Sequence, residues 1–146
     1  MRRTRRQPNR VAEPGAAERS VAERFVRETL GCGCAEEVFR HLETSRNLRV
    51  ADVPVAWRID VGRRLLVYVL EVEGPADLDR PLATLTRLGR VERDSAGYNR
   101  LRVVVATDDP AKLAERAREV LEGTGAVDDR VHLHVLPRAA VPPACA

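Results

Sequence analysis

The stretch Leu65-Leu-Val-Tyr-Val-Leu-Glu-Val72 decides the fold class, because seven of its eight residues are hydrophobic and apolar side chains fall on both faces. Such a run is typical of a central strand that other elements cover on both sides. In the preceding residues, Val55 to Val61, apolar side chains alternate with smaller or charged ones, which predicts a half-buried strand. Gly62-Arg63 fits a two-residue type II′ turn, so we expect the two strands to form a hairpin.

Two helices and two strands are expected after the hairpin. The first helix is indicated by Asp77 as its N-cap and by apolar residues at helical spacing, namely Leu78, Leu82, Leu85, Leu88 and Val91. Asp109-Pro110 opens the second helix, which ends at Gly123, because Asp is a good N-cap and Pro suits the first turn. The strands are 101–106 and 131–136. Strands that alternate with helices imply right-handed crossovers.

Two more helices are expected before the hairpin. Ser20-Val-Ala-Glu23 matches a capping box and predicts a helix from about residue 20 to 30, which Gly31 ends. A second helix is expected to begin after Cys34, with two glutamates in its first turn and with Val38, Phe39 and Leu42 facing inward.

These elements, in the order ααββαβαβ, predict the α+β class and a single two-layer α/β sandwich with a four-stranded mixed sheet. A thioredoxin-like or a ferredoxin-like arrangement would accommodate them, and the strand order stays open. We expect a disordered basic tail over residues 1–18, one α+β domain over 19–137 and a flexible C-terminal tail over 138–146.

Positive charge is concentrated at the N-terminus. The 146 residues carry 25 basic and 22 acidic side chains, a net charge of +3. Five arginines fall within the first ten residues, so residues 11–146 carry a net charge of −2. Nucleic-acid surfaces combine a basic face with aromatic side chains, and only 3% of this chain is aromatic. We therefore expect no nucleic-acid binding beyond weak, salt-sensitive contacts of the tail.

Composition also predicts the compartment. No apolar run approaches the roughly 20 residues that cross a bilayer, and no apolar segment follows the arginine-rich start as in a secretory signal. Three cysteines are too few for a disulfide scaffold and fit a reducing environment. We therefore expect a cytoplasmic protein without a membrane partner.

The segment Cys32-Gly33-Cys34 places two thiols between the end of one expected helix and the start of the next. The N–H groups and the dipole of the second helix would favour a thiolate at Cys34. A disulfide between residues two apart closes a small, strained ring and is therefore easily reduced. One interpretation is a thiol–disulfide redox protein, in which Cys34 is the nucleophile and Cys32 the resolving thiol.

A second interpretation is a metal site, because thiolates select zinc, copper(I) or iron–sulfur clusters. Structural zinc needs four ligands, which two Cys-Gly-Cys turns in a homodimer would supply. Cys145 is a further thiol, and His132 and His134 lie on one face of the last strand, where they would chelate a metal if the sheet brought them near the thiols. The third interpretation is that both cysteines of the turn are small buried residues that only pack.

Residues 25–39, Phe-Val-Arg-Glu-Thr-Leu-Gly-Cys-Gly-Cys-Ala-Glu-Glu-Val-Phe, resemble the motif F-x-x-x-T-L-G-C-x-C-P-x-E-V-F, found near the N-terminus of a small uncharacterised prokaryotic family. Ala35 stands where that motif has proline, so the next helix starts without proline's fixed φ. The resemblance implies that Cys32 and Cys34 belong to the motif, and it implies no activity.

Three functional hypotheses follow from the sequence. The first is a small cytoplasmic accessory protein that binds a metal ion or an iron–sulfur cluster through Cys32 and Cys34, as a homodimer or with a protein partner. The second is a thiol–disulfide redox protein that uses the same dithiol. The third is a non-catalytic interaction module with structural cysteines.

Overall fold

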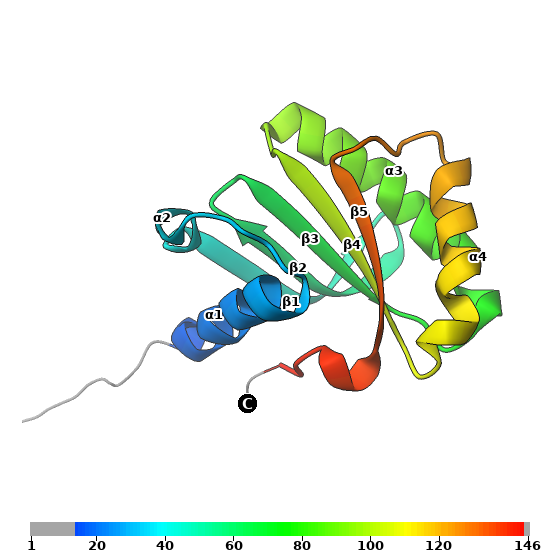
Figure 1. Ribbon diagram of the computed structural model, residues 1–146, viewed down its shortest axis with the longest axis horizontal. Helices are drawn as coiled ribbons and strands as arrows, with labels where there is room; N and C mark the ends of the chain where they lie inside the picture. Colours follow the sequence, from blue (N-terminus) through cyan, green and yellow to red (C-terminus); the bar gives the residue numbers. More distant parts are fainter. Residues whose placement is uncertain (1–13, 145–146) are drawn as a thin grey trace, which may run out of the picture.

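The computed structural model describes residues 14–144, which form one mixed sheet with helices on both faces (Figure 1). The helices are α1 (Pro14–Arg24), α2 (Glu36–Phe39), α3 (Asp79–Ala96) and α4 (Pro110–Gly123). The strands are β1 (Leu42–Val50), β2 (Val53–Val61), β3 (Leu65–Glu71), β4 (Arg100–Thr107) and β5 (Val131–Pro137). A π-helical turn, Phe25–Thr29, extends α1, and short 3-10 turns precede α3 and follow β5.

The five strands lie in the order β1-β2-β3-β4-β5. β1, β2 and β3 form an antiparallel meander, in which Ile59 pairs with Val67, whereas β3, β4 and β5 are parallel, with Val67 opposite Arg102. Each parallel connection runs through a helix, α3 or α4, because parallel neighbours need a long crossover. The α+β class and the mixed sheet are confirmed.

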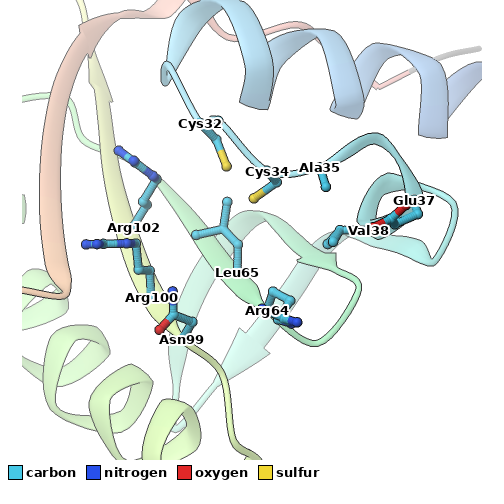
Figure 2. Close-up of a pocket in the computed structure, with 11 residues that line it drawn as sticks. Cys32, Cys34, Ala35, Glu37, Val38, Arg64, Leu65, Asn99, Arg100 and Arg102 are labelled. Carbon is cyan, nitrogen blue, oxygen red and sulfur yellow. The ribbon is translucent and has the colours of Figure 1, made fainter.

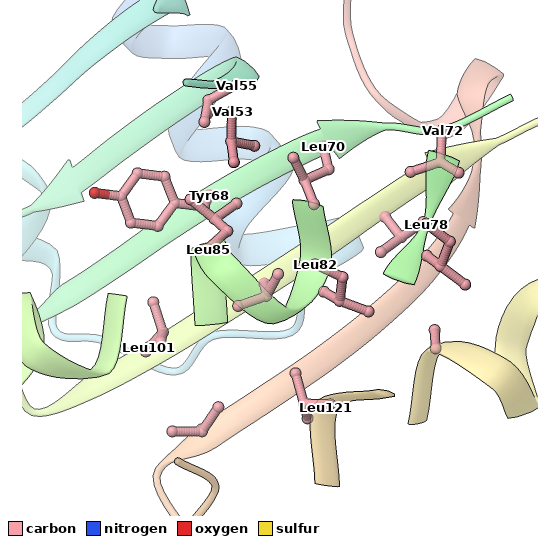
Figure 3. Close-up of a cluster of buried hydrophobic side chains, with 14 of the residues drawn as sticks. Val53, Val55, Tyr68, Leu70, Val72, Leu78, Leu82, Leu85, Leu101 and Leu121 are labelled. Atoms are coloured by element: carbon pink, nitrogen blue, oxygen red, sulfur yellow. The ribbon is translucent and has the colours of Figure 1, made fainter. Parts of the chain in front are cut away.

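The expected β3 is the centre of the structure. Its six residues from Leu65 to Leu70 are all buried, each at most 3% exposed. Leu66, Tyr68 and Leu70 pack with α3 and α4 in one core (Figure 3). Leu65, Val67 and Val69 pack with α1 and the π-helical turn in a second core on the opposite face. The molecule therefore has three layers rather than the expected two.

The prediction of four strands was wrong, because residues 42–50, for which no strand was expected, form the edge strand β1, and Leu42 begins this strand rather than facing inward from a helix. The polar residues Thr44 and Arg46 lie on the inward face of this strand. The sequence of β1 therefore lacks the regular alternation of apolar and polar residues that indicates a half-buried strand. Trp57 donates to the Thr44 hydroxyl through Nε1, and the Arg46 guanidinium lies 3.7 Å from the centre of the Trp57 ring. Helix α2 consequently ends at Phe39.

Several element boundaries also differ from the expectations. α1 begins at Pro14, so Ser20 lies inside the helix and its capping box is not formed. Asp77 lies in a 3-10 turn and gives no side-chain cap to α3. Of the apolar residues expected to face inward from α3, Leu88 and Val91 are exposed. The stop at Gly31 and the Asp109 cap, which accepts from the Lys112 N–H, are confirmed.

The chain ends were expected to be flexible. Residues 1–13 and 145–146, which include most of the basic tail and Cys145, lie outside the described part. Residues 138–144 contact β1, where Arg46 donates to the carbonyl oxygens of Pro142, at 2.9 Å, and Pro143, at 3.1 Å. Within residues 14–144, no helix combines the length and hydropathy needed to cross a membrane.

The hairpin between β2 and β3 turns at Gly62 and Arg63, as expected, but the turn type differs. Both residues have positive φ, +57° and +60°, which is typical of type I′ rather than type II′. The Arg64 N–H donates to the Val61 carbonyl oxygen at 2.9 Å. Gly62 also lies against α2, where a Cβ atom would come within 2.6 Å of the Val38 side chain and carbonyl oxygen.

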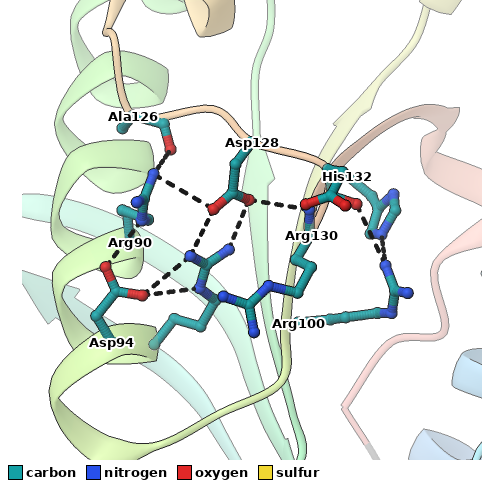
Figure 4. A network of polar contacts seen from close by, with 9 residues as sticks. Arg90, Asp94, Arg100, Ala126, Asp128, Arg130 and His132 are labelled. Carbon is teal, nitrogen blue, oxygen red and sulfur yellow. Dashed lines mark hydrogen bonds and ion pairs between the residues drawn. The ribbon is translucent and has the colours of Figure 1, made fainter.

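Arg93 and Asp128 join α3 to the loop before β5. Figure 4 shows Asp128 of this loop facing Arg90 and Asp94 of α3. Arg93 is only 1% exposed and donates to both carboxylate oxygens of Asp128 at 2.7 Å. Asp94 accepts from the same guanidinium at 2.9 Å. The hydrogen bonds from Arg93 hold the pKa of Asp128 well below its usual range.

We expect Gly62→Ala to lower the free energy of unfolding by at least about 2 kcal/mol, because alanine is strained at positive φ and its Cβ would clash with Val38. Gly123→Ala is the control, since its Cβ would meet nothing within 4 Å and its φ is not positive. Urea unfolding of both variants measures the difference. Equal stabilities of the two variants would contradict this packing of α2 on the hairpin.

We expect Asp128→Asn to lower the free energy of unfolding by about 2 kcal/mol at pH 7, because it leaves the buried Arg93 without its main anionic partner. The pKa of Asp128 is depressed in the folded state. Its ionised carboxylate therefore stabilises the folded protein fully at pH values above the pKa of an Asp in the unfolded chain, which is about 4. The difference from the wild type should therefore shrink as the pH falls below about 4 toward the depressed pKa. Urea unfolding between pH 2 and 7 measures it, with Asp129→Asn as the control. A difference that does not change with pH would count against the ion pair.

Candidate functional site

The Cys-Gly-Cys segment is positioned by the end of α1. The last turn of that helix is widened, and the Leu30 N–H donates to the Phe25 carbonyl oxygen at 3.1 Å. Gly31 then takes a φ of +74°, which only glycine adopts without strain. The Cys32 N–H donates back to the Val26 carbonyl oxygen at 3.0 Å. These contacts end the helix and turn the chain toward the sheet.

Cys32 and Cys34 are free thiols that are partly buried and pack against the core beneath α1. Figure 2 shows both sulfur atoms directed into the space between this segment and the sheet. That space is a cavity of about 410 Å³. Its other polar side chains come from α2, the β2–β3 turn and the start of β4, namely Glu37, Arg64, Asn99, Arg100 and Arg102.

Three arginines make this cavity basic. Arg100 and Arg102 lie at the start of β4. They extend from the same face of the sheet as α1, which covers the later part of this strand. Arg64 comes directly after the hairpin turn (Figure 2). In the described part of the chain, none of the three forms an ion pair with a carboxylate. The Nε atom of Arg102 is buried and has no hydrogen-bond partner among those residues.

Cys32 influences the protonation of Cys34. Burial raises the pKa of Cys34 to about 11, and the hydrogen bond and charge of Cys32 add to the increase. Arg102 acts in the opposite direction, because its positive charge favours the thiolate. Cys34 therefore keeps its proton at neutral pH. The expected stabilisation of a Cys34 thiolate by the following helix is absent because α2 has only four residues.

His132 and His134 lie on one face of the edge strand β5, as expected. The Nε2 atom of His132 lies 2.9 Å from Nη1 of Arg100, and that of His134 lies 2.8 Å from Nη1 of Arg102. Burial and these arginines lower the pKa of both rings, that of His134 to about 4, so both are neutral at pH 7 and accept these hydrogen bonds. The histidines thus contact the arginines of the cavity and do not line it with the thiols.

The structure brings together only part of the expected metal site. Cys32 and Cys34 share the cavity, whereas the histidines line a separate hollow along β5. Over residues 14–144, no three side chains of His, Cys, Asp or Glu gather where they could hold one metal ion. Cys145 lies outside the described residues.

The arginines of the cavity were not expected from the sequence. Arg100 and Arg102 alternate with Leu101 and Val103 at the start of an otherwise apolar strand, a signal that was available in the sequence. The two histidines lie on the same face of the neighbouring strand β5, where His132 is opposite Arg102. That β4 and β5 are neighbours depends on the strand order, which the sequence left open. Arg64 joins them only because the hairpin turn lies beside the start of β4, where the Arg100 N–H donates to the Arg64 carbonyl oxygen.

No protein-family model matches the chain, and no curated protein is detectably similar to it in sequence. The resemblance of residues 25–39 to a prokaryotic motif therefore stays a prediction. The function has to be argued from the cavity itself.

We expect Cys32→Ala to lower the pKa of Cys34 from about 11 while leaving it above the ordinary value of 9.0. The substitution removes the hydrogen bond and the charge of Cys32, whereas the burial that contributes most remains. Ultraviolet absorbance of the thiolate during a pH titration measures this, in a Cys145→Ala background so that only one thiol titrates. An unchanged pKa would show that the two thiols do not interact.

Proposed function

We propose that the protein carries out thiol–disulfide exchange with Cys32 as the nucleophile and Cys34 as the resolving thiol. The observation that carries the proposal is the pair of free, partly exposed thiols whose sulfur atoms face one cavity (Figure 2). The raised pKa of Cys34 supports this order of attack, which reverses the roles expected from the sequence. A nucleophilic thiol must be ionised, whereas a resolving thiol can keep its proton until the second step.

The exchange needs no reactant beyond a disulfide substrate. The Cys32 thiolate attacks one sulfur of the substrate, the substrate S–S bond breaks, and the leaving thiolate takes up a proton. Cys34 then loses its proton and attacks the Cys32 sulfur of the mixed disulfide, which releases the second substrate thiol. Two electrons and two protons pass from the dithiol to the substrate, and a Cys32–Cys34 disulfide remains.

The residue between the two cysteines is not enclosed by its neighbours. Gly33 is exposed, and a Cβ atom built on it would meet nothing within 4 Å, so no packing contact fixes this residue. A disulfide that spans one intervening residue closes a small ring and stores strain. Strained and exposed disulfides are readily reduced, which favours a reversible exchange over a permanent cross-link.

Single cysteine variants test the proposal in a Cys145→Ala background, with hydroxyethyl disulfide as a neutral substrate. We expect Cys32→Ser to reduce exchange to the rate of the substrate in buffer. Cys34→Ser should react once and stop at a mixed disulfide on Cys32, visible in the intact mass. The proposal fails if Cys32→Ser exchanges as fast as its parent, or if Cys34→Ser accumulates no mixed disulfide.

A metal ion or iron–sulfur cluster held between two copies of the chain is the second candidate. Two Cys-Gly-Cys segments would supply four thiolates, the number that structural zinc and [2Fe–2S] clusters use. The observation that favours it is the set of arginines that line the cavity and have no carboxylate partner within residues 14–144, because a site with four thiolates carries negative charge that they would neutralise. Zinc or iron bound in a fixed ratio to a homodimer, and lost in Cys32→Ser, would establish this candidate.

A further inference from the structure

We propose that the cavity beside the dithiol binds small disulfides that carry carboxylates, with Arg100 and Arg102 as the main contacts. This inference rests on the proposed exchange function and names its class of substrate. Three arginines and one glutamate line the cavity, a net charge of +2, although residues 11–146 together carry −2. The cavity therefore concentrates a charge that the rest of the domain lacks.

Arg102 is partly buried, whereas Arg64 and Arg100 are exposed. The other buried or partly buried arginines of this fold therefore provide a comparison for Arg102. Arg46 pairs with Glu18, Arg58 with Glu92 and Arg93 with Asp128. Each of these guanidiniums therefore has a carboxylate partner inside the protein. Within residues 14–144 Arg102 has no carboxylate partner, so its charge is available to an anion from outside.

The buried Nε atom of Arg102 strengthens the argument. A charged donor that is removed from water and left without an acceptor is costly. This atom is buried and unpartnered among the described residues, while Nη1 of the same guanidinium is hydrogen-bonded to His134. Guanidinium groups bind carboxylates through two parallel hydrogen bonds. A carboxylate in the cavity would supply the missing acceptor when the Arg102 side chain shifts toward it and brings Nε to the cavity surface.

The two histidines position the arginines for this role. Each neutral ring accepts a hydrogen bond from one Nη1 atom, His132 from Arg100 and His134 from Arg102. The backbone carbonyl of Asp129 also accepts from Arg100, at 3.3 Å. These contacts restrict both long side chains and leave their remaining N–H groups for a ligand. A neutral histidine suits this purpose, because a charged ring would repel the guanidinium.

The position of the arginines relative to the sulfur atoms fits a substrate with both groups. Arg102 is close enough to Cys34 for its charge to favour the thiolate, and Figure 2 shows Arg100 and Arg102 beside the space that the two sulfurs face. A cavity of about 410 Å³ lies within the range of small-molecule sites. A carboxylate a few bonds from a disulfide could therefore contact the arginines while its sulfur meets Cys32.

Exchange rates with three disulfides of different charge test the inference. The substrates are dithiodiglycolate, which is anionic, hydroxyethyl disulfide, which is neutral, and cystamine, which is cationic. We expect the rates to fall in that order. Arg102→Gln should reduce the rate with dithiodiglycolate about tenfold relative to the neutral substrate. Arg87→Gln, an exposed change on α3 across the sheet, should alter none of these ratios. Equal rates with all three substrates, or a ratio unchanged by Arg102→Gln, would overturn the inference.

A binding measurement separates this inference from the exchange function. The variant Cys32→Ser/Cys34→Ser lacks the reactive thiols but keeps the arginines, so calorimetry with dithiodiglycolate reports anion binding alone. We expect binding that Arg102→Gln abolishes in this background. Binding here without exchange in the wild type would remove the proposed function and keep the anion site. If the wild type exchanges disulfides but the double serine variant binds no dithiodiglycolate and the rates show no charge preference, the exchange function stands and the anion site is refuted.

Discussion

Burial of β3 on both of its faces is the constraint on which the rest of the structure depends. Its side chains alternate between two separate cores, and a strand with no solvent-facing side requires a covering layer above and below. The crossover helices α3 and α4 cover one face. The N-terminal helix must cover the other, and it ends where the Cys-Gly-Cys segment reaches the sheet. The position of the dithiol is therefore a consequence of core formation.

The same layer also explains why the cavity is polar. The second core contains Val104 and Ala106 of β4, whereas Arg100 and Arg102, on the same face of that strand, lie beyond the part that α1 covers. Neighbouring positions of β5 carry the two histidines. One face of the sheet thus changes from a buried core to a basic, partly exposed surface. The thiols lie at this boundary, where burial raises the pKa of one thiol and a nearby positive charge opposes the increase.

The sequence predicted those parts of the fold that carry local signals. The continuous apolar run of β3, the alternation in β2, the Asp-Pro start of α4 and the glycine that ends α1 all lie where expected. β1 was missed because Thr44 and Arg46 face inward and are accommodated by Trp57, a contact 11 or more residues away that no local pattern encodes. The cysteines of the candidate site were found from their spacing. The arginines were not, because their grouping depends on strand order and on the hairpin turn.

Thiol–disulfide exchange requires that Cys32 and Cys34 form a reversible disulfide rather than a metal site or an inert turn. Native mass spectrometry of the Cys145→Ala protein, purified without oxygen or chelator, distinguishes these three possibilities. We expect a metal-free chain that loses the mass of two hydrogen atoms when treated with a small disulfide and regains it on reduction. A dimer that carries zinc or iron, or a chain whose mass does not change on oxidation, would contradict it.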